Sequence, residues 1–177
     1  MVEELLDWKL SQEAIILLIA ASPVLELRGA LPLAINFFHM AWYKAFCLAI
    51  IGNLLPVPVL LLFLDSLTRI VSHVEVGRKA VNWVFDRTKR QGKDIEKYEK
   101  IGLTLFVAIP LPVTGAWTGS IAAFLLGLRF KYAFLSIFTG VIIAGAIVTC
   151  LCLLGWVGAV VAGVGLGTLA TLGWWRR

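Results

Sequence analysis

The sequence predicts an all-α polytopic membrane protein: an inverted repeat with two re-entrant helical hairpins, three spanning helices and a cytoplasmic interfacial amphipathic helix. The first observation is composition, since 60% of the 177 residues are hydrophobic, 15% are charged and the mean hydropathy is +0.90. Soluble domains are about half apolar and about a quarter charged. The second is that two apolar regions are broken by proline, glycine and charge. The third is that the net charge of +5 lies in blocks between apolar segments, a pattern typical of orientation in a bilayer and not of nucleic-acid binding.

Both broken regions are too short on either side of the break to cross a membrane. In residues 14–38, the arm before the break has 12 residues, which reach about 18 Å against a hydrocarbon core of about 30 Å. In residues 101–128, each arm has nine residues. Re-entrant hairpins would satisfy these lengths, with kinked spanning helices as the alternative. The predicted turn residues are Pro32, Pro110, Pro112, Gly115 and Gly119, because proline and glycine at this density end helices.

Three other apolar segments are long enough to span, namely 45–64, 132–154 and 156–173. With both hairpins re-entrant, 13 of the 16 lysines and arginines lie on one side of the membrane. The protein is predicted to lie in the cell (inner) membrane. The positive-inside rule then puts the basic side and the C-terminus in the cytoplasm, and the N-terminus on the outer side. The basic linker, 66–100, has apolar residues at helical spacing, which predicts a helix on the cytoplasmic membrane surface.

The two halves repeat each other at an offset of 88 residues. The stretch YKAFCLAIIGN, 43–53, aligns with KYAFLSIFTGV, 131–141, and pairs Gly52 with Gly140. The single domain, 1–177, therefore reads as repeat 1 at 14–65, repeat 2 at 101–154 and a C-terminal span. Since the predicted topology inverts one half relative to the other, the pattern matches the plan of secondary transporters, whose broken helices meet at mid-membrane.

Charge in the first turn carries the predicted site. Glu26 and Arg28 would lie where an isolated charge costs a few kcal/mol or more, so they form either a structural ion pair or a functional site. As a site, Arg28 would grip an anionic head group, helped by N–H groups near Gly29. Glu26 would carry a coupling proton, because loss of water favours the neutral carboxyl.

The second turn offers Thr114, Trp117 and Thr118 to the same cavity, as hydroxyls and an aromatic wall. Asn53, in the span 45–64, either joins helices or faces the substrate. The sequence contains no Gly-rich phosphate loop, no Ser–His–Asp set and no cluster of metal ligands. No catalytic residue, cofactor or metal is therefore expected.

Three motifs carry a family resemblance: ELRGALP at 26–32, GNLLPVP at 52–58 and PLPVTGAWTGSIAAFLLGL at 110–128. In these the chain resembles the small multidrug export proteins of bacteria and archaea. That family is similar to the DedA and VTT membrane proteins, which share paired re-entrant hairpins and are linked to polyprenyl-phosphate recycling and lipid scrambling. By position, Glu26 matches the acidic residue of the first DedA-type hairpin. The second DedA-type hairpin usually carries arginines, and this chain has none there.

These patterns predict a proton-coupled transporter or flippase, not an enzyme, for an amphipathic substrate such as a polyprenyl-phosphate-type or other anionic lipid. One alternative is efflux of small cationic drugs, with Glu26 and Trp117 binding the cation and Arg28 only pairing with Glu26. Another is a non-transporting, membrane-organising protein. The expected partners are membrane lipids, the lipid substrate, protons and a second copy of the chain in a homodimer, with no nucleic acid.

Overall fold

The computed structural model describes residues 11–71, 93–111 and 114–155. Within these ranges every regular element is helical, which confirms the all-helical class. Two segments, Trp42–Leu64 and Phe130–Leu153, are long and apolar enough to cross a bilayer, and they match the predicted spans 45–64 and 132–154. The predicted span 156–173 and the part of the linker at 72–92 lie outside the described residues. The re-entrant hairpins and the three-span topology stay predictions.

The chain divides into two compact units. One unit is Met1–Gly52 with Gly145–Arg177, and the other is Asn53–Ala144. Their boundaries fall inside α4 (Trp42–Leu54) and inside α9 (Phe130–Leu153). We refer to them as the first and second units, and each contains one helical hairpin.

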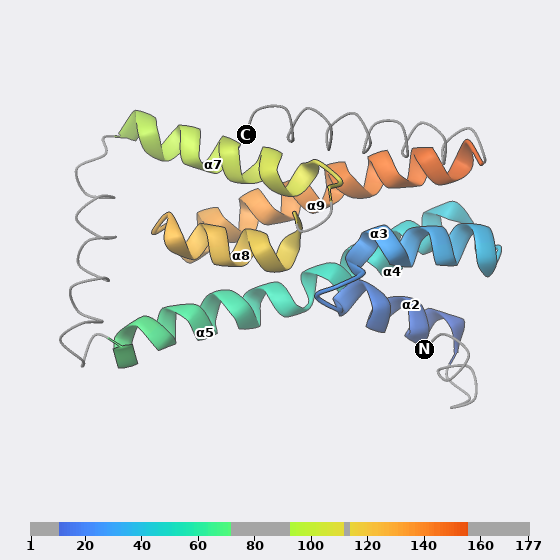
Figure 1. Cartoon of the computed structure of the whole chain (residues 1–177), viewed down its shortest axis with the longest axis horizontal. Helices are drawn as coiled ribbons and strands as arrows, with labels where there is room; N and C mark the ends of the chain where they lie inside the picture. The colour runs from blue at the N-terminus through green and yellow to red at the C-terminus, as the bar shows by residue number, and fades with distance from the viewer. Residues whose placement is uncertain (1–10, 72–92, 112–113, 156–177) are drawn as a thin grey trace, which may run out of the picture. The chain divides into compact units, whose positions relative to one another are not determined.

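The hairpin of the first unit joins α2 (Gln12–Ala21) to α3 (Glu26–Pro32), which runs on as the π-helix η1 (Leu33–Phe37). The α2 helix begins where the Ser11 hydroxyl accepts a hydrogen bond from the Ala14 N–H at 3.3 Å. It ends at Ser22, whose hydroxyl donates to the Ile19 carbonyl at 2.8 Å, and the following proline cannot continue it. The two arms pack together (Figure 1).

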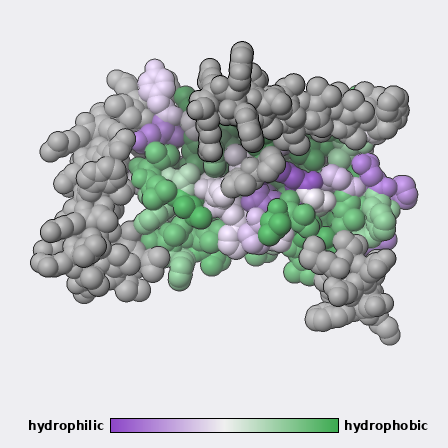
Figure 2. Space-filling view, in the orientation of Figure 1, coloured by the Kyte–Doolittle hydropathy of each residue, from purple (hydrophilic) through white to green (hydrophobic). Residues whose placement is uncertain are grey.

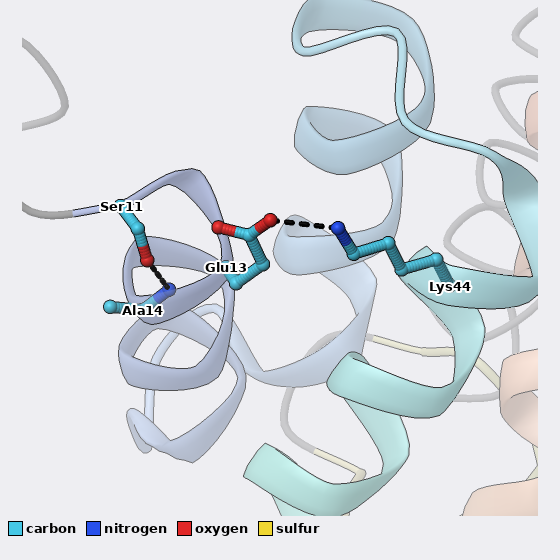
Figure 3. A network of polar contacts seen from close by, with 4 residues as sticks. All are labelled: Ser11, Glu13, Ala14 and Lys44. Atoms are coloured by element: carbon cyan, nitrogen blue, oxygen red, sulfur yellow. Dashed lines mark hydrogen bonds and ion pairs between the residues drawn. The ribbon is translucent and has the colours of Figure 1, made fainter.

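The hairpin of the first unit rests on α4. The Lys44 ammonium lies 2.7 Å from Glu13 Oε1 (Figure 3). Farther along, a Cβ placed on Gly52 would come within 2.7 Å of the Leu17 carbonyl oxygen and 2.8 Å of Ala20 Cβ. Only glycine therefore allows α4 and α2 to approach this closely.

The second unit comprises α5 (Pro56–Val71), α7 (Lys93–Ala108), α8 (Ala116–Leu125) and the first part of α9. The α8 helix packs against both α5 and α7 (Figure 1). It ends at Leu125. Two residues later, Gly127 has a φ of 67°, which suits glycine, and the Leu128 N–H donates to the Ala123 carbonyl at 3.0 Å. This pairing is a Schellman motif, which ends a helix by satisfying its last carbonyls.

The glycines aligned by the sequence repeat make equivalent contacts in their own units. A Cβ on Gly140 would come within 2.9 Å of the Thr104 carbonyl oxygen and 2.7 Å of Val107 Cβ. In both units, the glycine thus meets a carbonyl on the first arm of the hairpin and the residue three positions later. The two glycines that the predicted repeat aligns therefore have matching contacts.

Much of the described surface is hydrophobic, shown in green in Figure 2. The exposed large apolar side chains on the two membrane-length segments include Ile51, Val59, Leu62, Phe63, Ile142, Ile143 and Ile147. Water would oppose exposure on this scale, because contiguous apolar patches on soluble monomers seldom exceed a few hundred Å². Lipid tails, by contrast, solvate such side chains without penalty.

Two expected turn residues lie elsewhere. Pro32 lies at the end of α3, within the second arm, and the turn itself is formed by residues 22–25. The Arg28 carbonyl loses its helical donor at Pro32. Directly afterwards the Leu33 N–H donates to the Gly29 and Ala30 carbonyls, and the π-helical stretch ends where the Phe38 N–H donates to the Leu33 carbonyl at 2.9 Å. Gly119 is also helical, in α8, where a Cβ would come within 2.6 Å of Val107 Cγ2. Pro110 and Gly115 do lie in the connection between α7 and α8, and Pro112 is outside the described residues.

Candidate functional site

Glu26 begins α3 directly after the hairpin turn. Its side chain is 5% exposed, and among the residues whose burial is described it is the one charged side chain classed as buried. Its φ is 51°, in the left-handed region that costs most residues roughly 1–2 kcal/mol. A turn that needed only this backbone shape would favour glycine or asparagine. A buried glutamate in this conformation is therefore a candidate functional residue.

Arg28 follows on the same helix and is partly buried. Its guanidinium is attracted electrostatically by the Glu26 carboxylate. The structure thus brings the two predicted charges together within one hairpin. An arginine keeps its proton under all physiological conditions and presents a planar set of donors to carboxylate or phosphate oxygens.

Gly29 allows the backbone to pass close to the turn. A Cβ there would lie 2.9 Å from Leu25 Cβ and 3.3 Å from Leu25 Cδ2. Its N–H donates to the Leu25 carbonyl at 3.0 Å. The structure therefore gives Gly29 a packing role, and substrate binding at this residue stays a prediction.

In the second unit, Thr114 organises the connection between α7 and α8. Its hydroxyl lies 2.8 Å from the Ile109 carbonyl and 3.0 Å from the Leu111 carbonyl. Thr118 holds the beginning of α8, where its hydroxyl accepts from the Gly115 N–H at 2.9 Å. Trp117 lies between them and is partly buried. Both threonines thus bond to the backbone of their own hairpin, and a role for any of the three in binding substrate stays a prediction.

Two buried polar side chains lack a hydrogen-bond partner among the described residues. Asn53 is fully buried, and neither its amide nitrogen nor its amide oxygen has a partner. Thr149, on α9, is 5% exposed and its hydroxyl is likewise unpartnered. The sequence analysis missed Thr149, although a threonine inside an otherwise apolar helix was the available signal. Buried polar groups are normally hydrogen-bonded, so both positions call for an explanation.

The predicted site residues fall into both units. Glu26, Arg28 and Gly29 belong to the first, whereas Asn53, Thr114, Trp117 and Thr118 belong to the second. The predicted meeting of the two turns in one cavity stays a prediction. Across 11–71, 93–111 and 114–155, no group of three or more histidine, cysteine, aspartate or glutamate side chains could hold a metal ion.

Membrane-length apolar helices, exposed apolar surface and a buried acid beside an arginine define a helical membrane protein with a charged site inside an apolar hairpin. Comparison with family models identifies it further. Residues 26–147 match the family described as "Putative small multi-drug export protein", and the chain belongs to that family. The matched range includes Glu26, both repeat glycines and the connection between α7 and α8. No curated protein and no solved structure matches the chain.

Proposed function

We propose that this protein is a transporter that moves small amphipathic molecules across the cell membrane, and that Glu26 carries the proton that drives transport. The observation that supports this most directly is the position of Glu26. Its carboxyl is buried, its backbone is in a conformation that disfavours glutamate, and its neighbour is an arginine. The family description, a multi-drug export protein, agrees with the general class.

The chemistry of the pair suits a linkage in which substrate and proton bind together and leave together. A carboxylate removed from water favours its neutral form, while a nearby cation favours its charged form. An anionic substrate that binds Arg28 would withdraw the cation from Glu26 and promote uptake of a proton. Departure of the substrate would restore the pair and release the proton. Binding and protonation would thus be coupled.

For the substrate, we favour an amphipathic molecule with an anionic head group, such as a polyprenyl phosphate or another anionic lipid. Arg28 would provide two parallel N–H donors to a phosphate. The second candidate is a cationic drug, and a drug substrate agrees with the multi-drug export that the family description names. In that case Glu26 would bind the cation and Arg28 would only balance the empty site.

The proposed setting is a pair of re-entrant hairpins in the cell (inner) membrane, with the N-terminus outside and the C-terminus in the cytoplasm. The ten residues of α2 support this, since they reach about 15 Å, half the hydrocarbon thickness. A homodimer would enlarge the wall around the substrate. Labelling of single cysteines at positions 40 and 90, after replacement of Cys47, Cys150 and Cys152, tests the topology. Labelling of both positions from the same side would contradict it.

The function is tested in proteoliposomes with an imposed pH gradient, by following a fluorescent polyprenyl phosphate or a cationic dye. We expect Glu26→Gln to abolish gradient-driven transport, because glutamine keeps the shape but carries no proton. Glu13→Gln is the matched control, since Glu13 is a carboxylate on the same hairpin whose side chain is 40% exposed. Full transport by the Glu26→Gln protein would contradict proton coupling at Glu26. Absence of transport by the wild type would instead favour the membrane-organising alternative.

Arg28→Gln separates the two substrate classes. For an anionic substrate, loss of the guanidinium removes the group that binds the head, so transport should fall at least tenfold, which corresponds to about 1.4 kcal/mol. For a cationic substrate, the same variant should retain or improve transport. Retained lipid transport in Arg28→Gln would rule out a head-group role for this arginine.

A further inference from the structure

The segment Trp42–Leu64 is apolar throughout but is interrupted in its middle. The α4 helix ends at Leu54, Leu55 is a turn residue, and α5 begins at Pro56. Pro56 and Pro58 have no backbone N–H, so the helical hydrogen bonds to the carbonyls of Gly52 and Leu54 cannot form. A break in the middle of a membrane-length segment thus leaves backbone oxygens without their usual donors.

Asn53 lies between these two carbonyls in the chain. Its side chain is 0% exposed, and neither atom of its amide has a hydrogen-bond partner among the residues described. An unsatisfied buried amide costs roughly 1–3 kcal/mol in proteins. Since both amide atoms are unpartnered, either orientation of the amide leaves its oxygen available.

We propose that Asn53, with the carbonyls of Gly52 and Leu54, forms a binding site for a monovalent metal cation such as Na⁺. The three consecutive residues supply neutral oxygens, the ligand type that replaces the hydration shell of such ions in channels and transporters. They also form the last turn of α4, where the helix dipole contributes partial negative charge. Interrupted transmembrane helices in secondary transporters bind Na⁺ through the same combination of free carbonyls and helix C-terminal ends.

Among the three residues of the proposed site, the acceptors outnumber the donors. The Asn53 amide oxygen and the carbonyls of Gly52 and Leu54 all accept, whereas the Asn53 amide nitrogen is the one side-chain donor of these three residues. A cation satisfies several acceptors at once, and a protein binds it there without a change in protonation. The site would supply a coupling ion in addition to the proton at Glu26, and it does not depend on that proposal.

The test measures thermal unfolding of the whole chain in lipid nanodiscs at constant ionic strength. Sodium chloride and potassium chloride are compared with the chloride of N-methyl-D-glucamine, a cation too large for the site. We expect a metal ion to raise the Tm along a saturating curve, because a ligand of the folded state stabilises it. Asn53→Leu, which has a similar size but no oxygen, should lose this rise.

Two variants separate cation binding from general packing. Asn53→Asp keeps an oxygen and adds negative charge, so it should reach the same rise in Tm at lower salt. Thr149→Val removes another buried and unpartnered polar group, and should leave the response unchanged. A wild-type Tm that is equal in all three chlorides would overturn the proposal, as would a rise that persists in Asn53→Leu. The wild-type comparison alone decides the question if Asn53→Leu does not fold.

Discussion

The Lys44 ammonium donates to Glu13 Oε1 at 2.7 Å, and so joins the first turn of α2 to the first turn of α4 in the first unit. This contact lowers the pKa of Glu13 from 4.5 to about 2, chiefly through the hydrogen bond from Lys44. Both side chains are substantially exposed, so salt and solvent weaken the pair.

This lowered pKa predicts a specific pH dependence. A carboxylate whose pKa is lower in the folded state stabilises the fold above its unfolded pKa, and that contribution disappears as the pH falls through the folded value. The Tm of the wild type should therefore slightly exceed that of Glu13→Gln above pH 4.5, and the gap should close as the pH approaches about 2. A gap that widens on acidification would contradict the assignment.

The repeat glycines predict a paired packing defect. Gly52→Ala and Gly140→Ala would each place a Cβ within 3 Å of backbone, and overpacking of this kind typically costs about 1–3 kcal/mol. Gly102→Ala, in α7, is the matched control because a Cβ there meets nothing within 4 Å. There the higher helix propensity of alanine should make the change neutral or stabilising. Denaturant unfolding of the three variants in one detergent measures the difference, and equal effects would show that the contacts are not tight.

The left-handed backbone at Glu26 separates stability from function. Glu26→Gly removes the side-chain clash of that conformation, whereas Glu26→Ala retains it. Glu26→Gly should therefore unfold with a free energy about 1 kcal/mol higher than Glu26→Ala, although neither variant can carry a proton. Thermal unfolding provides the comparison. A more stable alanine variant would show that the φ of 51° is not maintained.

The hydroxyl of Thr114 should stabilise the connection between α7 and α8. Thr114→Val removes the one hydroxyl proton, which is shared between the Ile109 and Leu111 carbonyls, at a cost of about 1 kcal/mol. Amide hydrogen exchange in residues 109–115 should accelerate. Thr139→Val is the control, because that hydroxyl bonds only within its own helix, to Leu135. Unchanged amide exchange in the Thr114→Val protein would show that this hydroxyl does not stabilise the connection.

The positions of the helix breaks could be predicted from sequence because they rest on local covalent chemistry. Proline lacks an N–H wherever it lies, so the sequence predicts the second break at PLPVTGAWTG, 110–119. The connection between α7 and α8 occupies the first part of that stretch, because α8 already begins at Ala116. The first turn lies earlier in the chain than the predicted one around Glu26, Arg28 and Pro32, because Ser22 followed by Pro23 already ends α2. The π-helical stretch Leu33–Phe37, directly after Pro32, is a feature that sequence periodicity does not record.

The candidate site was predictable to a similar degree. A glutamate and an arginine in an apolar segment are recognisable as candidate site residues from the sequence alone, and the structure places both in one hairpin. By contrast, the left-handed backbone of Glu26 and the complete burial of both amide atoms of Asn53 are consequences of tertiary packing. The hydroxyls of Thr114 and Thr118 were expected to line a cavity, yet each has backbone partners nearby that compete for it.

The matched glycine contacts also bear on the ancestry of the chain. Each contact joins residues that lie within about 37 positions of one another in the sequence. A gene that encoded half of this chain would therefore encode a complete pairing of one hairpin with the helix that follows it. Duplication and fusion of such a gene would leave two copies that diverge freely at their surfaces and at their charged residues. The glycines would resist that divergence, because neither copy could lose its own without separating the helices that it holds together.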